Sequence, residues 1–456
     1  MRAQRRTFAL IAGAAVTLVA GLVMATVTQA EAASNAAAVA CTAPTWAEGN
    51  TYTAGTQVTY GGKLYQALVT HTAYVGAGWN PAATPSLWKD LGACTGGSPT
   101  ASPSPSRSVS PSPSVSPSRS TSPSPSRSPS SSPTTSTSPG GNTCAVKSRP
   151  AGKVLQGYWE NWDGASNGVH PGLGWIPITD SRIKQHGYNV INAAFPVIRS
   201  DGTVLWENGM DAGVKVSTPA EMCAAKAAGA TILMSIGGAA AGIDLSSSTV
   251  ADKFVATIVP ILKTYNFDGI DIDIETGLTG SGNISTLSTS QANLIRIIDG
   301  VLAQMPSNFG LTMAPETAYV TGGSVTYGSI WGSYLPIIKK YVDNGRLWWL
   351  NMQYYNGSMY GCAGDSYSAG TVQGFQVQTN CLNSGLTIQG VTIRVPYDKQ
   401  VPGLPAQSGA GGGYMTPSLV SQAYNTQLKG LMTWSINWDG SKSWTFGDNV
   451  KSLQGR

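Results

Sequence analysis

Three carboxylates alternate with isoleucines in the stretch FDGIDIDIE, residues 267–275. If this stretch is a β-strand, Asp271, Asp273 and Glu275 lie on one face and the isoleucines on the other. Because like charges a few ångströms apart cannot all ionise cheaply, at least one acid should hold a proton near neutral pH. A protonated acid beside an ionised one is what glycosidic bond cleavage requires. The alternatives are a solvated acidic strand end or a cation site, although cation ligands usually come from loops.

The elements that must position these acids lie in residues 144–456. Buried-strand candidates recur there with helical or loop spacers: Val154–Trp159, Asn189–Phe195, Thr231–Ile236, Gly269–Glu275, Leu311–Pro315, Leu347–Tyr354, one within Val391–Leu404, and Gly430–Ile436. Eight such strands predict an α/β fold, a (β/α)8 TIM barrel whose chemistry lies at the C-terminal strand ends. Glu275 is expected to end the fourth strand, where a catalytic side chain belongs.

Composition argues against several other functions. Only 11% of the 456 residues are charged, while 13 are Trp and 18 are Tyr, which suits an uncharged partner such as a sugar better than a nucleic acid. The net charge of +5 lies mostly in arginines of the N-terminal segment and linker, so no basic binding face is expected. Three histidines in the whole chain argue against a Ser-His-Asp triad or a His-rich zinc site. We expect no metal and no other cofactor.

The N-terminal segment, residues 1–32, has the pattern of an export signal. Basic Arg2, Arg5 and Arg6 precede the apolar stretch Phe8–Val27, and Ala30-Glu31-Ala32 offers a cleavage site. A secreted, extracellular protein is therefore expected, exported by the ordinary or the twin-arginine route. Residues 95–143 consist almost wholly of Ser, Pro, Thr and Gly, which predicts an extended linker.

Residues 41–94 form a small unit bounded by Cys41 and Cys94. Apolar residues alternate between glycine turns, which predicts a short antiparallel sheet. A unit of this size buries little surface, so a disulfide between its end cysteines would stabilise it. The flanking Gly78 and Pro81 place Trp79 in a turn from which its ring could stack on a sugar.

The acidic stretch resembles the DxxDxDxE signature of glycoside hydrolase family 18, the chitinases and their relatives, with Asp268 as its first acid. Ser235-Ile236-Gly237-Gly238 is similar to the SxGG motif of that family. The resemblance implies that the N-acetyl oxygen of the substrate attacks the anomeric carbon, because this family is a substrate-assisted exception among retaining glycosidases.

The resemblance to this family also implies a role for each matching residue. Glu275 would be the general acid and then the base, Asp273 would orient the acetamido group, and Asp271 would share a proton with Asp273. Ser235 would hydrogen-bond Asp271. Asp268 has the wrong parity for that face, and a structural hydrogen bond is as good an interpretation for it as a catalytic part.

Other segments resemble the family less strictly. Met352-Gln353-Tyr354-Tyr355-Asn356 is similar to M-x-Y-D, with Gln353 in place of Met and Asn356 in place of Asp. Tyr355 is then the tyrosine that donates to the acetamido oxygen, and Tyr354 is its rival. Trp434 would form the floor of the sugar pocket. Further residues are expected to line the substrate groove: Met313, Pro315, Glu316, Trp159, Trp162 and Asn192. The interval from Leu404 to Gly430 leaves no room for a large insertion, which predicts a shallow, open cleft.

The small unit resembles a family 5/12 carbohydrate-binding module of chitinases, in which Trp79 would contact chitin and Trp88 would be core. The six cysteines include no CxxC pair, which predicts disulfides in a secreted protein. The residues alone leave their pairing open. Besides Cys41–Cys94, we expect a bridge between Cys362 and Cys381, which bracket a glycine-rich loop. That choice leaves Cys144 with Cys223.

The resulting hypothesis is a secreted, monomeric endo-chitinase with a chitin-binding module, acting on chitin and chito-oligosaccharides and on neither nucleic acid nor membrane. Two alternatives remain open. One is an endo-β-N-acetylglucosaminidase acting on glycoprotein glycans, which the chitin-type module disfavours. The other is a non-catalytic chitin lectin, which the presence of Glu275 disfavours.

Overall fold

A computed structural model describes residues 39–47, 50–53, 55–68, 71–73, 80–82, 87–95, 142–164, 170, 173–239 and 242–456. The described residues fall into two compact units, one within 39–95 and one within 142–456, and each is considered by itself. The predicted export signal (1–32), linker residues 96–141 and Trp79 lie outside the described residues.

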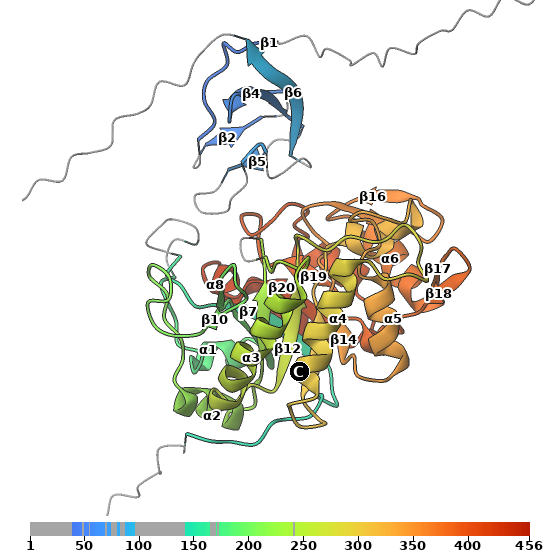
Figure 1. Cartoon of the computed structure of the whole chain (residues 1–456). Coiled ribbons are helices and arrows are strands. Elements are labelled where there is room, and N and C mark those ends of the chain that lie inside the picture. The colour runs from blue at the N-terminus through green and yellow to red at the C-terminus, as the bar shows by residue number, and fades with distance from the viewer. Residues whose placement is uncertain are drawn as a thin grey trace, which may run out of the picture. The chain divides into compact units, whose positions relative to one another are not determined.

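The small unit is a β-structure, as expected. Its strands are β1 (Val39–Ala40), β2 (Thr51–Tyr52), β3 (Gln57–Tyr60), β4 (Lys63–Ala67), β5 (His71–Thr72) and β6 (Trp88–Thr95) (Figure 1). One sheet has the order β1-β6-β4-β3, in which only the β1–β6 pair is parallel, and β2 pairs with β5. Gly61 and Gly62 turn the chain between β3 and β4 with φ of 56° and 76°.

The core of the small unit is aromatic. Trp88 is 2% exposed and packs edge-on against Tyr52, their ring centroids 5.0 Å apart, so the prediction that Trp88 is core is confirmed. The predicted Cys41–Cys94 disulfide is also present. It links the residue after β1 to β6, where these two neighbouring strands run in register.

The large unit contains the predicted barrel. Its strands are β7 (Val154–Glu160), β8 (Val190–Ala194), β11 (Thr231–Gly237), β12 (Gly269–Asp273), β13 (Gly310–Met313), β14 (Trp349–Leu350), β19 (Gly403–Pro405) and β20 (Gly430–Trp434). They pair in parallel in the order β14-β13-β12-β11-β8-β7-β20-β19. Parallel bridges from Leu350 to Gln400 and from Gln353 to Gly403 join the two end strands. The eight strands therefore close on themselves.

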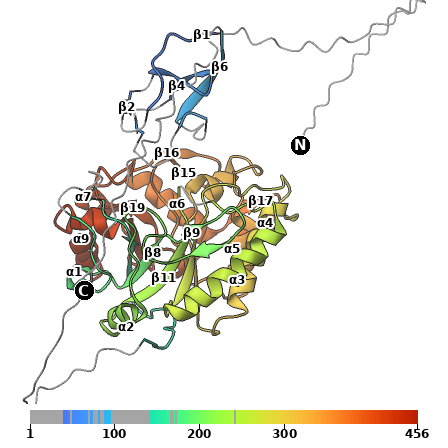
Figure 2. The ribbon, with the colours of Figure 1, turned by 60° about the vertical axis from the view of Figure 1, so that its left-hand side comes forward.

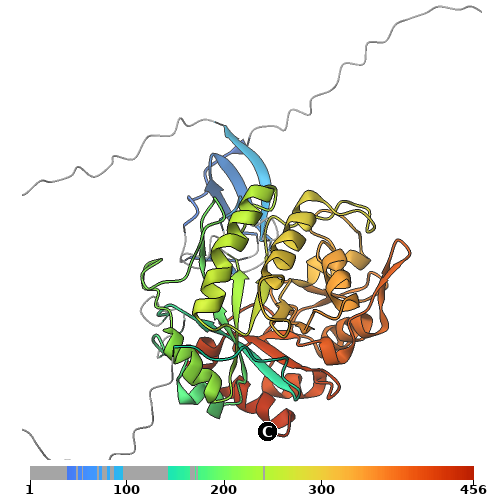
Figure 3. The same ribbon diagram turned by 60° about the horizontal axis from the view of Figure 1, so that its bottom comes forward.

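Helices surround the strands. They are α1 (Ser181–Gln185), α2 (Pro219–Ala227), α3 (Ser248–Thr264), α4 (Thr289–Leu302), α5 (Leu335–Asp343), α6 (Val372–Ser384), α7 (Pro417–Ala423), α8 (Ile436–Gly440) and α9 (Thr445–Leu453). Figure 2 shows α2 and α3 outside β8 and β11, and Figure 3 shows α3 and α4 side by side. Capping boxes, Thr218 with Glu221 and Ser288 with Gln291, begin α2 and α4. Among the helices of the described ranges, none combines the length and apolar character that a membrane span needs.

Short elements complete the large unit. These are the pairs β9 (Val197–Ile198) with β10 (Val204–Leu205), β15 (Ser358–Tyr360) with β16 (Ser366–Ser368), and β17 (Leu386–Ile388) with β18 (Val391–Ile393), and the 3-10 turns η1 (Thr317–Tyr319), η2 (Thr321–Ser324) and η3 (Tyr397–Lys399). The segment between β19 and β20 contains α7 and no inserted sheet, as its length predicted.

Several barrel strands differ in extent from the prediction, the seventh, sixth and fourth among them. The seventh barrel strand is only Gly403–Pro405, because Val391–Ile393 pairs locally as β18. The sixth barrel strand is reduced to Trp349–Leu350, because Pro315, which follows the neighbouring strand β13, has no N–H to continue the ladder of hydrogen bonds. The Gln353 N–H still bonds the Pro315 carbonyl at 2.9 Å.

The fourth strand ends at Asp273 and not at Glu275. Beyond Asp273, the N–H and the carbonyl of Ile274 both bond the Tyr334 hydroxyl and not a neighbouring strand. Glu275 is therefore two residues past the sheet.

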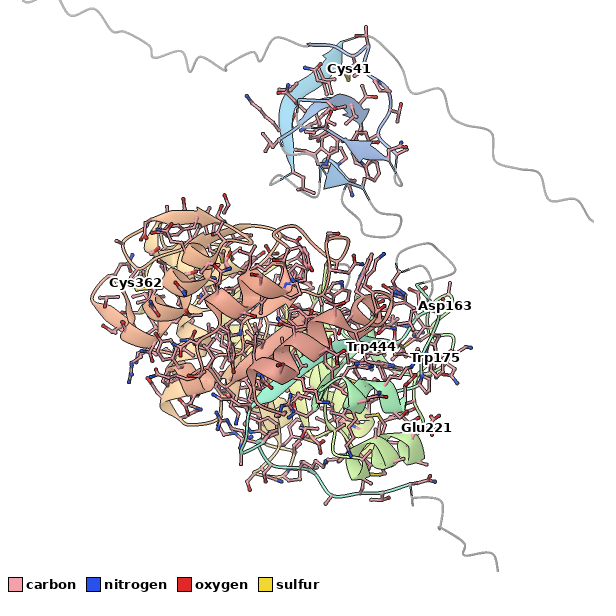
Figure 4. All side chains as sticks on the ribbon, turned by 180° about the vertical axis from the view of Figure 1, so that it is seen from behind. Cys41, Asp163, Trp175, Glu221, Cys362 and Trp444 are labelled. Carbon is pink, nitrogen blue, oxygen red and sulfur yellow. A yellow bond between two sulfur atoms is a disulfide. The ribbon has the colours of Figure 1, made fainter. Side chains whose placement is uncertain are left out.

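The N-terminal ends of the strands are bound by the segment that precedes β7. The Lys147 N–H bonds Asp268 Oδ1 at 2.7 Å, and its Nζ bonds carbonyls of Lys226 and Ala230. A disulfide joins Cys144 to Cys223 of α2, and another joins Cys362 (labelled in Figure 4) to Cys381, both as predicted. Residues 142–150 thus lie across the end of the barrel opposite the acidic residues.

Candidate active site

Asp271 lies in a cage of hydrogen-bond donors inside the barrel. Its Oδ2 accepts from the hydroxyls of Tyr158 and Ser235, each at 2.8 Å. Its Oδ1 accepts from the Thr312 hydroxyl at 2.6 Å and from the Asn351 amide at 3.0 Å. The expected bond from Ser235 is confirmed. Ser235 is itself fully buried, so it supports the carboxylate and presents no surface to a ligand.

One amide joins the other two acids. Gln353 Nε2 lies 2.9 Å from Asp273 Oδ1 and 2.8 Å from Glu275 Oε1, and 3.1 Å from the Ala314 carbonyl oxygen. The fixed Gln353 side chain therefore sets the separation of Asp273 and Glu275. Asp273 is 3% exposed, whereas Glu275 is half-buried. Of the two, Glu275 is the carboxyl that a ligand can reach more freely.

Two tyrosines hold the backbone that carries Glu275. The Tyr319 hydroxyl donates to the carbonyl of Glu275 at 2.5 Å, and Tyr334 bonds the preceding residue. On the other side, Gly238 N–H bonds the Asp273 carbonyl at 2.7 Å. At Gly237, φ is 107° and a Cβ would lie 2.1 Å from that carbonyl oxygen, so only glycine fits. The SxGG segment therefore permits a close approach at the end of β12.

Burial and mutual repulsion keep protons in this cluster. Burial, followed by the charges of Glu275 and Asp271, raises the pKa of Asp273 well above its usual value. Burial raises the pKa of Asp271 and of Glu275 as well, against the opposing effect of their hydrogen bonds. Burial and the Glu275 charge raise the pKa of Glu316 to about 8. At neutral pH the four carboxyls therefore cannot all be ionised.

The tyrosine doublet after β14 divides between two environments. Tyr354 is 1% exposed and packs on Phe375 of α6, with ring centroids 5.2 Å apart. Burial and the charges of Asp273 and Glu275 raise the pKa of Tyr355 far above its usual value, which places Tyr355 beside the acids. Of the two tyrosines, Tyr355 is therefore the one whose hydroxyl interacts with the acidic cluster.

Trp434 ends β20 and lies among aromatic rings. Its ring centroid is 5.4 Å from that of Tyr158, 6.0 Å from that of Phe195 and 6.2 Å from that of Trp162. Because Tyr158 also bonds Asp271, this cluster lies next to the acids. Trp434 is half-buried, so part of its surface is accessible.

Several residues that were expected to line the groove do not. Met313 is fully buried in the core outside the strands, and it points away from Thr312, which contacts Asp271, because successive side chains of β13 alternate. Trp159 is likewise fully buried and donates to the Ile176 carbonyl. Asn192 is fully buried inside the barrel, where it accepts from Gln156. The prediction that these three residues contact the substrate is wrong.

Asp268 has the structural role that was left open. Its carboxylate accepts backbone N–H bonds from Lys147 and Ile232 and forms an ion pair with Lys226 at 2.7 Å. These partners lie at the N-terminal end of β12, whereas Glu275 follows the other end. Asp268 therefore takes no part in the acidic cluster.

Sequence reasoning missed the cage around Asp271. Tyr158 lies on β7, Thr312 lies on β13 and Asn351 directly follows β14, and no motif marks them. A register argument would have found part of it, since Ser235, Asp271 and Thr312 are directly paired across β11, β12 and β13. Asn351 and Gln353 alternate on one face of the predicted sixth strand, Leu347–Tyr354, which was a further signal.

Comparisons with known proteins agree with this geometry. A family model described as Glycosyl hydrolases family 18 matches residues 154–359, and one described as Carbohydrate-binding module family 5/12 matches residues 45–89. Endochitinase 37 of Trichoderma harzianum is 84% identical over 311 residues, which cover 68% of this chain and 92% of the relative. Endochitinase 4 of Metarhizium robertsii is 83% identical over 312 residues, covering 68% and 90%. A Family GH18 Chitinase structure from Chromobacterium violaceum has a TM-score of 0.58 and 28% identity, covering 91% of this chain and 100% of that one.

Proposed function

Because this chain belongs to glycosyl hydrolases family 18, we propose that it is a secreted endochitinase that hydrolyses the β-1,4 bonds between N-acetylglucosamine units of chitin. The single observation that carries the proposal is the Asp273–Gln353–Glu275 arrangement, in which one amide bonds a buried and a half-exposed carboxyl. This arrangement offers a proton to a leaving group and an anion to orient the neighbouring amide of the sugar.

The first step transfers the Glu275 proton to the glycosidic oxygen as that bond breaks. The acetamido oxygen of the sugar attacks the anomeric carbon and forms an oxazolinium ion, so the protein supplies no nucleophile. Asp273 accepts the N–H of the acetamido group and balances the positive charge. Glu275, now ionised, takes a proton from water, which opens the ring with overall retention.

The neighbouring groups prepare this step. The cage fixes Asp271 behind Asp273, and the charge of Asp271 raises the pKa of Asp273. The two carboxyls therefore share a proton, and Asp273 is the anion when that proton lies on Asp271. Tyr355 donates its hydroxyl to the acetamido oxygen, and Trp434 forms the floor under the sugar. Glu316 lies in register with Gln353 and adds a further carboxyl near Glu275.

The module is proposed to hold the enzyme on insoluble chitin. It raises the concentration of the barrel near its substrate and leaves the chemistry unchanged. Trp79 is proposed as its contact to the polymer, and residues 1–32 as the signal for secretion.

The test is the isosteric variant Glu275→Gln. An amide oxygen at this position can still accept from Gln353, so the fold should persist, while hydrolysis of an N-acetylglucosamine oligomer falls by more than about 100-fold. Glu207→Gln, which removes an exposed carboxyl elsewhere, is the matched control and should keep full activity. Near-normal hydrolysis by Glu275→Gln contradicts the proposal.

A second measurement tests substrate assistance. Wild-type enzyme should cleave an N-acetylated oligomer and release the β-anomer first, but leave the deacetylated oligomer intact. Cleavage of the deacetylated oligomer, or a covalent sugar ester trapped on an aspartate, contradicts the mechanism. Release of glycans from a glycoprotein with no action on chitin would assign a different substrate.

A further inference from the structure

A buried glutamate–histidine pair lies at the end of β7, separate from the acidic cluster. Glu160 Oε2 is 2.6 Å from His170 Nε2, and both side chains are fully buried. The His170 ring packs directly on the backbone of Gly164, where a Cβ would lie only 2.1 Å from the ring. Figure 4 shows Asp163 and Trp175, which precede and follow His170 in the sequence, at one edge of the barrel unit. The proposed reaction assigns no role to this pair.

The hydrogen-bond partners of His170 determine its protonation state. Nε2 faces a carboxylate oxygen, and Nδ1 faces the Leu173 carbonyl oxygen at 3.0 Å. Both partners are acceptors, so both ring nitrogens must donate, which only the imidazolium form allows. Burial by itself would lower the pKa of His170, but the hydrogen bond and charge of Glu160 raise it above its usual value.

A chain of hydrogen bonds leads from this pair to Ser435, the residue that follows Trp434. The other oxygen of Glu160 accepts from the Ser435 hydroxyl at 2.5 Å, and Ser435 Oγ in turn accepts from the Trp438 N–H at 3.1 Å. Ser435 directly follows Trp434 and caps α8. The Glu160 N–H also bonds the Asn437 side chain at 3.0 Å. The backbone that carries the Trp434 ring is therefore held on the side facing Glu160.

We propose that the Glu160–His170 pair is a positioning element which, through Ser435, holds the Trp434 ring against the acidic cluster and thereby sets the affinity for the reacting sugar. The proposal rests on the proposed function of this chain. The ring of Trp434 packs on that of Tyr158, so a shift of Trp434 alters the surface proposed to support the reacting sugar.

The arrangement also makes sugar affinity depend on pH. Glu160 of β7 is the carboxylate that contacts His170. The helix α8 packs on His170 through Trp438, and its Asp439 is bound by Tyr188 and two backbone N–H groups. Because Glu160 raises the pKa of His170 above its usual value, the imidazolium form persists to higher pH than in a free histidine. As pH rises through that pKa, one of the two acceptors loses its donor.

The experiment compares Ser435→Ala and His170→Gln with the control His186→Gln, which removes a histidine–carboxylate pair at the surface. Binding of an N-acetylglucosamine oligomer is measured by calorimetry in the Glu275→Gln background, and KM and kcat in the active enzyme. We expect Ser435→Ala and His170→Gln to weaken binding about ten-fold and to raise KM with kcat nearly unchanged. His186→Gln should bind like the parent.

A double-variant cycle separates positioning from general support of the fold. In a Trp434→Ala background, Ser435→Ala should weaken binding no further, because its effect acts through that ring. Wild-type KM should rise as pH increases through the pKa of His170, and this rise should be absent in His170→Gln. If Ser435→Ala weakens binding equally in both backgrounds, or not at all, the inference is overturned. Ser435→Ala carries this test even if His170→Gln does not fold. If wild-type enzyme binds the oligomer without cleaving it, the proposed function fails while the inference stands.

Discussion

The Tyr334 hydroxyl forms two hydrogen bonds with the backbone of Ile274, accepting from its N–H at 3.0 Å and donating to its carbonyl at 2.8 Å. Ile274 separates Asp273 from Glu275, so a side chain sixty positions along the chain terminates the acidic strand. A hydroxyl can satisfy both backbone groups, which would otherwise seek partners in a neighbouring strand. Glu275 is thereby released from the sheet yet held in place.

The tyrosine doublet provides a direct comparison. Tyr355→Phe should lower kcat on an N-acetylglucosamine oligomer by about 100-fold, because a donor to the developing charge on the acetamido group is lost. Tyr354→Phe, which alters a ring packed in the outer core on Phe375, should change kcat less than about two-fold. Steady-state kinetics of both variants check this, and equal losses would contradict the assignment of Tyr355.

Glu316 should determine the alkaline limb of the pH profile. The pKa of Glu316 is raised to about 8 by burial and by Glu275, so the two carboxyls together retain a proton up to that pH. In Glu316→Gln the like charge of residue 316 is gone, so Glu275 should lose its proton at lower pH. The alkaline limb of kcat should then move to lower pH while the neutral rate is kept. The pH dependence of kcat for this variant and for the control Glu207→Gln tests the shift. An unmoved limb argues against the coupling.

Lys226 is expected to matter for stability and not for catalysis. Lys226→Met leaves the Asp268 carboxylate buried without its cation, which should lower the free energy of unfolding by about 3–5 kcal/mol. Lys339→Met removes an exposed helical pair with Asp343 and should cost about 0.5 kcal/mol or less. Urea unfolding measures both, and oligomer turnover by folded Lys226→Met should equal that of the parent. A loss of kcat there would give Asp268 a part in the reaction.

Adsorption to insoluble chitin should depend on Trp79. Trp79→Ala should weaken adsorption by about ten-fold, since a ring stacked on a sugar is lost, and leave turnover of soluble oligomers unchanged. Leu68→Ala, which removes an exposed apolar side chain of the same module, should adsorb normally. Sedimentation with chitin particles measures both. Unchanged adsorption of Trp79→Ala would refute its role.

The acidic strand and the barrel could be predicted because their signals are local. Alternation of Asp271, Asp273 and their isoleucine neighbours is visible in five residues, and the eight apolar segments recur along the chain. Non-local effects were not accessible: Tyr334 shortens β12, and Pro315 interrupts the ladder of β14. Met313 was assigned to the site from its segment, although its parity relative to Thr312 directs it outward.

The first residues of the barrel unit are fastened to its base by a covalent bond and a buried charge. Cys144 is bonded to Cys223, and the Lys147 N–H bonds Asp268, whose ion pair with Lys226 secures the same corner. The acids and Trp434 lie at the other ends of the strands. If the chain before residue 142 were pulled, as when an anchored enzyme moves across a solid surface, the force would therefore act first on the N-terminal ends of the barrel strands. The catalytic geometry would be spared that strain until the disulfide-bonded corner gave way.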